Sequence, residues 1–581
     1  MRVHAIGAAP GIAFGSAYSL PQWEYELPDR IIDVAQLGHE IQRLYEGVSI
    51  SKAELEELKQ GISAYLGEDE LRIFDAHIAI LEDPQFLKEI QNVIRQQYKV
   101  AEVAVKEVMD RFSHLFEQLE DQVMQDRSLD IRDVGNRLLK HLIGAMHVIE
   151  PPTDTPYIVV ARELTPSQLA HLDPKHLVGI VIMTNSANSH TAIMARALGI
   201  PCVVGLEGRL TTPIQTGDRL IIDGERGIID LDPDDETIAR YMQILEENRR
   251  EQLHLRAIES LPASTVDGLE LHLDANVGFA SEVGDDLLRY AEGIGLYRTE
   301  FEYLDRSSWP TEEQLYQTYR TVISRLQGKP CVMRTLDIGA DKQLPYLNLS
   351  AEDNPSLGMR AIRFSLRYRD IFKSQLRAIL RASAHGPVKI MYPFIASLEE
   401  VREANRLLEE VRQELSAEMP GKLALASHVE TGIMIELPSA VSIIDLLMDE
   451  VDFVSIGSND LVQYMLAVDR MNAMVSRLYD PYHPAIIRTF RAIAEAARQA
   501  MKPVSVCGEL AADPDYLPIW IGLGITRLSM STHSILPLKR RIRGLAAGNC
   551  RSLVKELLAC KTSEEVRKRV HDFNVLIETS R

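Results

Sequence analysis

A histidine at the start of a predicted helix is the first residue whose surroundings suggest chemistry. Residues 184–205 run from a polar loop into the triplet Ser-His-Thr around His190, and apolar side chains then recur at helical spacing until Gly199 and Pro201 end the pattern. The unpaired backbone N–H groups and the positive end of the helix dipole at such a terminus favour an anion. A phosphoryl group carried on the His190 imidazole would therefore be stabilised electrostatically.

Cationic side chains that follow apolar, strand-like runs in the second half of the chain form another group of candidates. Guanidinium groups bind oxygen atoms in pairs and stay charged at every relevant pH, so a set of them suits a ligand that carries a phosphate ester and a carboxylate. Any one of them alone is more commonly part of a surface ion pair. The candidates are Arg298, Arg334, Lys342, Arg360, Arg363 and Arg470.

Two carboxylates occupy corresponding places at the ends of neighbouring runs. Glu436 closes the run GIMIE, and Asp460 follows Asn459 after the next run. Mg²⁺ accepts a few carboxylate oxygens completed by substrate and water, so Glu436 and Asp460 are candidate magnesium ligands. Capping of the following helix by Asn459 or Asp460 is an alternative, and both roles can coexist. Glu430 lies on the same strand face as Glu436, and we assign it no role.

Cys507 ends the run VSVC and is followed directly by Gly508. Free cysteines pack well in apolar cores, so the residues alone favour a packing role at this position. The five cysteines are odd in number and contain no CxxC pair, which argues against a disulfide framework or a zinc site.

The elements that must position these residues fall into two halves. Residues 3–20 are typical of a strand, a turn and a second strand, residues 31–149 show helical periodicity, and strand-like runs return between residues 155 and 233. We therefore expect a helical bundle inserted into a small α/β domain. Residues 234–260 are charged and lack glycine and proline, which predicts a connecting helix.

Beyond Leu269 the chain contains eight strand-like runs separated by helical stretches, the first of them LELHLDANV and the last ITRLSMS. Alternating units of this number over about 300 residues predict a (β/α)8 barrel, whose active sites lie at the carboxyl ends of the strands. A doubly wound open sheet is the structural alternative.

Length and composition limit the class of protein. A chain of 581 residues exceeds what one hydrophobic core usually supports, so several domains are expected. No apolar run is long enough to span a membrane and no signal peptide is visible, which predicts a cytoplasmic protein. The net charge of -21 argues against nonspecific binding to nucleic acid and suits a partner with a basic docking face.

The motifs taken together resemble those of the enzyme I family of phosphoenolpyruvate-protein phosphotransferases, which is related to pyruvate phosphate dikinase and phosphoenolpyruvate synthase. SHTAIMARALGIP is similar to the family's phosphohistidine loop. Six later runs of this sequence are similar to motifs of the family's substrate-binding barrel: GIGLYRTEF, RTLDIGADKQLPY, NPSLGMRAIR, GIMIELPSA, GSNDLVQYMLAVDR and VCGELAADP. The likeness therefore covers nearly the whole chain.

This resemblance implies a domain order. Residues 1–22 and 150–232 are expected to form the phosphohistidine domain, and residues 23–149 an inserted helical domain that binds a carrier protein. Residues 233–262 are expected to form the linker helix, and residues 263–581 the phosphoenolpyruvate-binding (β/α)8 barrel, which also dimerises.

The resemblance also implies residue roles. His190 corresponds to the histidine that attacks the phosphorus of phosphoenolpyruvate, through Nε2 in the family, and Cys507 to the acid that protonates the enolate to give pyruvate. Glu436 and Asp460 correspond to Mg²⁺ ligands. Substrate contacts are implied for Arg298, Arg334, Lys342, Arg360, Asn459, Asp460 and Arg470. The implied partners are an HPr-like phosphocarrier protein and a second copy in a homodimer.

Some positions depart from the family pattern. Met359 stands where a tryptophan is common, which affects the packing around the substrate and not the arginine roles. The run ANSH before Thr191 is closer to the nitrogen-related branch than to the sugar branch, yet the GAF sensory domain usual in that branch is not in this sequence. The branch and the identity of the carrier protein stay open.

Three hypotheses for function follow. The first is a phosphoenolpyruvate-protein phosphotransferase that charges a small carrier protein in a phosphotransferase system. The second is a dikinase or synthase relative, which would need ATP; the sequence shows no Gly-rich phosphate loop and no room for an ATP-binding domain. The third is a non-catalytic scaffold of the same fold, against which the presence of His190, Cys507 and the arginines argues.

Overall fold

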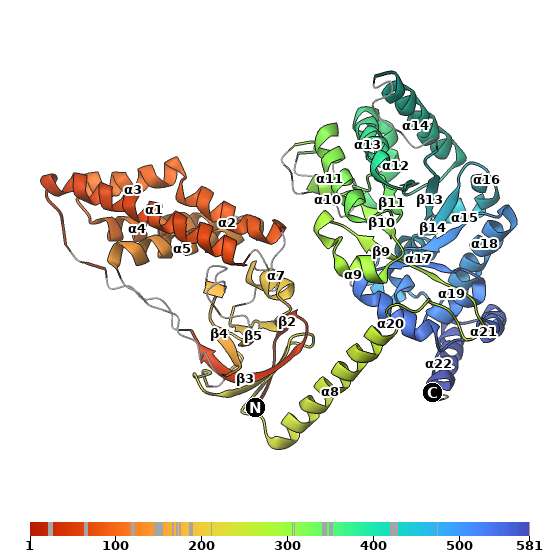
Figure 1. Ribbon diagram of the computed structural model, residues 1–581, viewed down its shortest axis with the longest axis horizontal. Coiled ribbons are helices and arrows are strands. Elements are labelled where there is room, and N and C mark those ends of the chain that lie inside the picture. Colours follow the sequence, from red (N-terminus) through yellow and green to blue (C-terminus); the bar gives the residue numbers. More distant parts are fainter. Residues whose placement is uncertain are drawn as a thin grey trace. The chain divides into compact units, whose positions relative to one another are not determined.

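The fold is described from a computed structural model that divides into two compact units, Met1–Arg250 and Glu251–Arg581 (Figure 1). The structure describes all residues except 21–26, 29, 63–67, 118–121, 145–154, 165–167, 170–171, 173–175, 185–189, 211, 305, 307, 340–345, 348–351, 419–427, 473 and 580–581.

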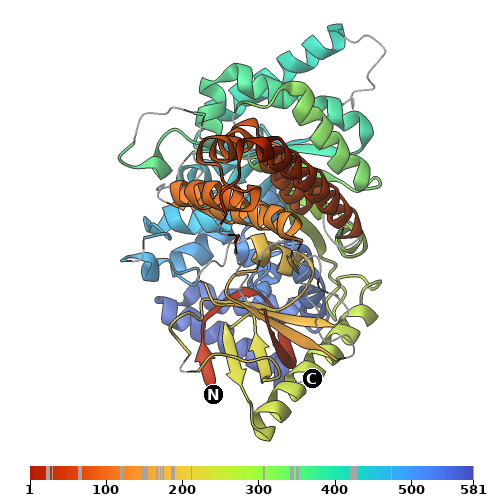
Figure 2. The ribbon, with the colours of Figure 1, turned by 90° about the vertical axis from the view of Figure 1, so that its left-hand side faces the viewer.

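The first unit is built on an eight-stranded mixed sheet in the order β1-β8-β7-β3-β4-β5-β6-β2. The four strands from β3 to β6 pair in parallel, and the remaining pairs are antiparallel. Figure 2 shows the first strands, in red, beside strands that come much later in the chain. The strands are β1 (Arg2–His4), β2 (Ile6–Ala9), β3 (Ile12–Ser19), β4 (Tyr157–Ala161), β5 (Leu177–Ile182), β6 (Cys202–Val204), β7 (Arg219–Asp223) and β8 (Ile228–Leu231).

The first twenty residues form three strands, where the sequence pattern predicts two. Ala5 alone separates β1 from β2, although these strands lie at opposite edges of the sheet. The sheet must therefore curl until its edges meet, and the Ala5 N–H donates to the Gly227 carbonyl at 2.7 Å there. A Cβ on Gly7 would lie 2.3 Å from the Gly224 carbonyl oxygen, so this closure requires glycine.

A helical bundle separates β3 from β4, which confirms the predicted insertion, and the parallel β3–β4 pair shows that the chain returns beside the strand it left. Figure 1 shows these helices running side by side. Their apolar faces and one face of the sheet share a continuous set of buried side chains, as amphipathic periodicity predicts. The helices are α1 (Leu37–Ile62), α2 (Glu68–Leu81), α3 (Pro84–Gln97), α4 (Ala101–Glu117) and α5 (Gln122–Ile143).

Two further helices match the sequence analysis. Helix α7 (His190–Ala197) begins at His190, as the pattern after that residue predicts. Helix α8 (Asp235–Ala257) is the expected connecting helix, and its first turn holds two acidic residues that complement the helix dipole. The exact domain boundaries given above stay predictions.

The second unit contains a closed barrel of eight parallel strands, which confirms the (β/α)8 prediction and excludes the open sheet. Each of the eight predicted runs contains one strand. The strands are β9 (His272–Val277), β10 (Ile294–Arg298), β11 (Cys331–Arg334), β12 (Val388–Tyr392), β13 (Thr431–Ile435), β14 (Phe453–Ile456), β15 (Val504–Val506) and β16 (Arg527–Met530).

Helices cover the outside of the barrel, while Leu296, Val332, Met391, Met434 and Phe453 form a buried apolar cluster with Cys507. The helices are α9 (Asp285–Tyr290), α10 (Phe301–Leu304), α11 (Glu312–Arg325), α12 (Ala361–Arg367), α13 (Arg369–Ala382), α14 (Leu398–Glu418), α15 (Pro438–Ser442), α16 (Ile444–Met448), α17 (Ser458–Leu466), α18 (Pro484–Ala500), α19 (Leu517–Leu523), α20 (Thr532–Ile542), α21 (Ala547–Ala559) and α22 (Ser563–Thr579). Among the described helices, none is both long and apolar enough to cross a bilayer.

The stability of the barrel should depend on the aromatic cluster between α18 and α19. Phe490 is fully buried, with ring centroids 4.7 Å from Trp520 and 6.2 Å from Tyr516. We expect Phe490→Ala to lower the free energy of unfolding of the barrel by about 3–5 kcal/mol, because it leaves a cavity. Leu446→Ala, at a half-exposed position of α16, is the control and should cost less than about 1 kcal/mol in urea unfolding. Equal losses would contradict this account.

Candidate active site

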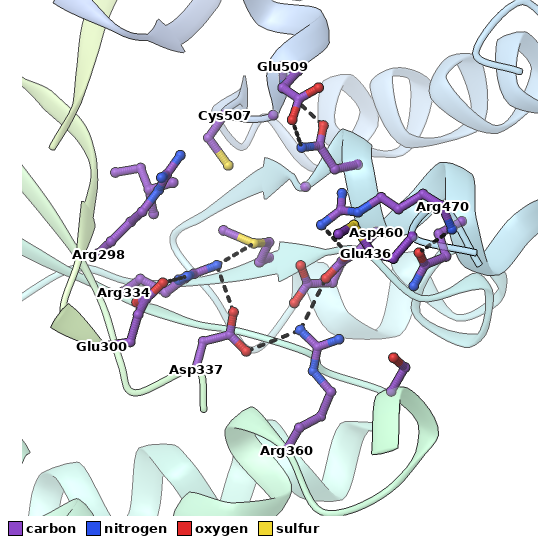
Figure 3. A pocket seen from close by; sticks show the side chains of 18 of the residues that line it. Arg298, Glu300, Arg334, Asp337, Arg360, Glu436, Asp460, Arg470, Cys507 and Glu509 are labelled. Atoms are coloured by element: carbon purple, nitrogen blue, oxygen red, sulfur yellow. Dashed lines mark hydrogen bonds and ion pairs between the residues drawn. The ribbon is translucent and has the colours of Figure 1, made fainter. Parts of the chain in front are cut away.

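A cavity of about 300 Å³ opens at the carboxyl ends of the barrel strands. Arg298 and Arg334 are the last residues of β10 and β11, Glu436 follows β13, and Cys507 follows β15. Asp460 lies in the first turn of α17, directly after β14. Figure 3 shows these side chains around a common centre, although more than 200 residues separate the first from the last. The closed barrel brings them together because its parallel strands all end at the same face.

A chain of alternating charges crosses this cavity (Figure 3). Arg334 donates to Glu300 at 2.5 Å and pairs with Asp337 at 3.1 Å. Arg360 joins Asp337 to Asp460, with its Nη2 atom 3.2 Å from an oxygen of each. The chain ends at Arg470, whose Nη2 atom lies 3.5 Å from the other oxygen of Asp460.

The two central arginines are buried, with 7% of Arg334 and 6% of Arg360 exposed. The neighbouring carboxylates outweigh the effect of burial and raise the pKa of both guanidinium groups, so both stay charged. Arg360 is held further by its bond to the Tyr464 hydroxyl at 3.0 Å and by the Phe394 ring, 4.3 Å from its Cζ atom. Both arginines are therefore fixed in place before any ligand arrives.

Arg298 and Arg470 are less confined. Arg298 is exposed, and the side chain of Arg470 is 35% exposed. Both line the cavity, so their guanidinium groups can bind an anionic ligand at the rim.

Glu436 lines the cavity and is 2% exposed. Its carboxylate accepts a hydrogen bond from the Phe394 N–H at 2.5 Å. Burial, followed by the charges of Asp460 and Asp337, raises the pKa of Glu436, while Arg360 and Arg334 oppose that rise. The site thus gathers more negative charge beside Glu436 than its arginines offset, and a divalent cation would relieve this repulsion.

The donor set fits magnesium. No group of three or more His, Cys, Asp or Glu side chains suited to a metal occurs in the part of the chain that the structure describes. Glu436 and Asp460 supply carboxylate oxygens only, and Mg²⁺ characteristically takes one or two carboxylates and completes its octahedron with substrate oxygens and water.

Cys507 lies one residue past the end of β15 and is 4% exposed. Burial raises the pKa of its thiol, an effect that Ser455 and two arginines reduce, so the thiol keeps its proton at neutral pH. Gly508 follows because the chain passes very close to α17: a Cβ there would lie 2.9 Å from the Ser458 backbone nitrogen. A protonated thiol facing the cavity can act as an acid.

Asn459 is held by the residue that follows this glycine. Its side-chain nitrogen donates to Glu509 at 2.9 Å, and its side-chain oxygen accepts from the Glu509 N–H at 3.0 Å. This double contact orients the amide at the cavity wall.

The predicted residues fall into three groups. The cavity lining includes Arg298, Arg334, Arg360, Glu436, Asn459, Asp460, Arg470 and Cys507. Lys342 lies outside the described residues. Arg363 does not line the cavity and donates to the Leu357 carbonyl at 2.7 Å. His190 belongs to the other compact unit, where the next residue, Thr191, donates from its hydroxyl to the Leu164 carbonyl.

Sequence reasoning missed three acidic partners of the predicted site residues. Glu300, Asp337 and Glu509 line the cavity and bind Arg334, Arg360 and Asn459. All three lie inside motifs quoted above, each within three residues of a predicted site residue. Their proximity along the chain was a usable signal, because a buried guanidinium requires a nearby carboxylate.

Comparison with known proteins agrees with this geometry. Three family models match successive parts of the chain: the N-terminal domain of PEP-utilising enzymes at residues 4–127, their mobile domain at residues 153–227, and their PEP-binding domain at residues 252–547. The barrel, its arginine-containing cavity and these matches define a phosphoenolpyruvate-utilising enzyme.

Relatives that match nearly the full length of the chain identify the family within this class of enzymes. The phosphoenolpyruvate-protein phosphotransferase of Staphylococcus carnosus is 39% identical over 98% of this chain and 99% of its own length. Its namesake from Geobacillus stearothermophilus is 41% identical over 97% of this chain and 96% of its own length. The chain belongs to the family of phosphoenolpyruvate-protein phosphotransferases, the enzyme I components of phosphotransferase systems. It is therefore an enzyme that transfers the phosphoryl group of phosphoenolpyruvate to a histidine, as the first hypothesis predicts.

The buried charge chain predicts an unequal cost of removing arginines. Arg360→Met should lower the free energy of unfolding of the barrel by about 3–5 kcal/mol, because Asp337 and Asp460 would lose a buried partner. The control is Arg402→Met, which removes an exposed arginine that pairs with Glu450 at 2.8 Å and should cost less than about 1 kcal/mol. Urea unfolding measures both, and an equally small loss for Arg360→Met would refute the role given to this ion pair.

Proposed function

We propose that His190 is the histidine that receives the phosphoryl group and passes it to a small HPr-like phosphocarrier protein. His190 is the first residue of α7, where the positive end of the helix dipole stabilises the charge of a phosphohistidine. The observation that carries the proposal is the cavity itself, in which arginines surround two candidate magnesium ligands and a buried thiol.

Phosphoenolpyruvate would bind with its phosphate and carboxylate oxygens toward the arginines. Arg298 and Arg470 offer guanidinium groups at the rim, and Arg334 is fixed beside Cys507 and Glu436. Asn459, oriented by Glu509, would add an amide contact. Arg360 holds Asp460 in place, and Lys342 is proposed as a further contact from the resemblance alone.

Glu436 and Asp460 would hold Mg²⁺, which the enzymes of this family generally use. When bound, the ion offsets the negative charge of the transferring phosphoryl group and the leaving enolate. The positioned arginines act in the same direction, and because they are fixed before the reaction begins, little reorganisation accompanies the transition state.

The proton and the phosphoryl group then follow separate paths. A nitrogen of the His190 ring attacks the phosphorus in line with the bond to the leaving oxygen, and that bond breaks to leave the enolate of pyruvate. The Cys507 thiol donates its proton to C3 of the enolate, which yields pyruvate and a thiolate. Since His190 and the cavity belong to different compact units, the ring must enter the cavity for transfer and leave it before meeting the carrier.

Three further points are proposed from the family alone. The helical insert would dock the carrier protein, the barrel would form a homodimer, and the enzyme would act in the cytoplasm.

Labelling tests the acceptor. Incubated with ³²P-phosphoenolpyruvate and Mg²⁺, the wild type should gain acid-labile, base-stable label and transfer it to added HPr. His190→Ala should gain none, because it lacks the attacking nitrogen. His39→Ala, which removes an exposed histidine of the helical unit, is the matched control and should label normally. A wild type without label would contradict the proposed function, and a labelled His190→Ala would contradict the assignment of the acceptor.

Removing the thiol tests the proton donor. Cys507→Ala should lower the rate of pyruvate formation about 10²- to 10⁴-fold and leave the affinity for phosphoenolpyruvate nearly unchanged, because only the acid is lost. Cys331→Ala, at a buried cysteine of β11 outside the cavity, is the control and should keep the wild-type rate.

The pH profile provides a second readout for the same residue. The forward reaction needs the protonated thiol, and burial raises the pKa of Cys507 above the ordinary cysteine value. The rate should therefore stay level as the pH rises through the usual cysteine range and fall only above it. A rate that declines already near neutral pH, or equal losses of rate and affinity in Cys507→Ala, would count against this donor.

A further inference from the structure

The carbonyl group of Cys507 has an unusual partner inside the barrel. The ladder between β15 and β16 consists of Ser505 and Val506, paired with Arg527 and Leu528, and it ends there. On the β14 side, the Cys507 N–H donates to the Ile456 carbonyl at 3.1 Å. The carbonyl of Cys507 therefore lies past the end of the ladder with β16.

Asn276 of β9 supplies the missing contact. Its side-chain nitrogen donates to the Cys507 carbonyl oxygen at 3.0 Å, across a sequence separation of 231 residues. β9 pairs with β16 and not with β15, so this amide reaches over the intervening strand through the barrel interior. Such contacts follow from barrel geometry, because inward side chains of alternate strands share a layer.

A second hydrogen bond fixes the amide of Asn276. The Ser529 hydroxyl, on the intervening strand β16, donates to the Asn276 side-chain oxygen at 2.6 Å, and Ser529 is 1% exposed. A carbonyl oxygen only accepts hydrogen bonds, so the amide nitrogen must face Cys507 and the amide oxygen must face Ser529. The orientation of the amide is thus determined by its two partners.

The peptide after Cys507 needs such a restraint. Gly508 lacks a side chain because α17 lies too close, and glycine leaves the backbone more freedom than other residues. The thiol itself makes a weak contact from Sγ to the Ile456 carbonyl at 3.6 Å. A shift of the Cys507 backbone would carry Sγ with it, and an error of about 1 Å in a catalytic group can cost about 100-fold in rate.

We propose that Asn276, held by Ser529, is a positioning residue that aims the Cys507 thiol at C3 of the enolate. This rests on the proposed role of Cys507 as the proton donor. Asn276 is not among the residues that line the cavity, so it acts through the Cys507 peptide and not on the substrate.

Loss of the Asn276 side chain should affect protonation of the enolate and not binding of phosphoenolpyruvate. Asn276→Ala should lower the single-turnover rate of pyruvate formation about 10- to 100-fold, while the dissociation constant of phosphoenolpyruvate in the presence of Mg²⁺ stays unchanged. Ser529→Ala should have a smaller effect in the same direction. The double variant should be no slower than Asn276→Ala, because Ser529 acts through Asn276.

The configuration of the product gives a readout that loss of folded protein does not change. Phosphoenolpyruvate that carries one deuterium at C3 in a single geometry is turned over by the full chain in tritiated water, and the chirality of the pyruvate methyl group is measured. The wild type should protonate one face. In Asn276→Ala the enolate should escape to solvent, so the methyl group should approach a racemic mixture.

Leu273→Val is the matched control, because Leu273 is buried on the same strand and belongs to the apolar core outside the barrel. It should lose some stability and keep the single configuration. Asn276→Ala with wild-type rate and configuration, or with a lower rate and a single configuration, would overturn the inference. If Cys507→Ala formed pyruvate at the wild-type rate, the proposed role of Cys507 as proton donor would be refuted. This outcome is distinguishable from a result with Asn276→Ala that refutes only the positioning role of Asn276.

Discussion

The buried chain of alternating charges at the mouth of the barrel is the interaction on which the site depends. Two guanidinium groups cannot be removed from water without partners, and Glu300, Asp337 and Asp460 supply them. Each carboxylate holds an arginine at a set place, so Arg334 and Arg360 are positioned during folding and not by the ligand. A site arranged in this way can stabilise charge that develops in a reaction without first reorganising itself.

The closed barrel brings the members of this charge chain together. Its members come from β11 and from the segments after β10, β11 and β14, and these segments meet because all parallel strands end at one face. Close approach between strand ends also sets the local sequence. Gly457 and Gly508 stand where a Cβ would lie 2.8 Å from the Glu436 carboxylate and 2.9 Å from the Ser458 nitrogen, respectively. A larger residue at either position would change the distance between the Cys507 thiol and the Glu436 carboxylate.

Burial changes the protonation and charge preferences of individual groups in the site. The same apolar interior that surrounds Cys507 raises the pKa of its thiol, so a packing role and the proposed acid role are compatible in one residue. The cluster of carboxylates around Glu436 is a poor site for another negative charge and a good one for a divalent cation. The proposed acceptor His190 has a different environment, at the N-terminus of α7 in the other compact unit, where the helix dipole favours a bound phosphoryl group.

Much of this arrangement could be predicted from local pattern. Strand-like runs alternating with helical periodicity predicted every barrel strand, and Gly199 and Pro201 after an apolar helical repeat placed the helix that begins at His190. Residues at or after the strand ends, together with the family resemblance, identified eight side chains that line the cavity, because the barrel places every strand end at one face. The helical insert was visible as a change in periodicity.

Contacts between distant segments could not be predicted in this way. No periodicity indicates that Ala5 lies where two sheet edges meet, that Asp337 bridges Arg334 and Arg360, or that Asn276 reaches Cys507 over an intervening strand. These contacts depend on strand register and on the shape of a closed sheet. The sequence by itself thus determined which elements form and which side chains stand at their ends, since these follow from neighbours along the chain. Only the tertiary structure decided which side chains pair, because pairing depends on the barrel bringing distant strands to within hydrogen-bonding distance.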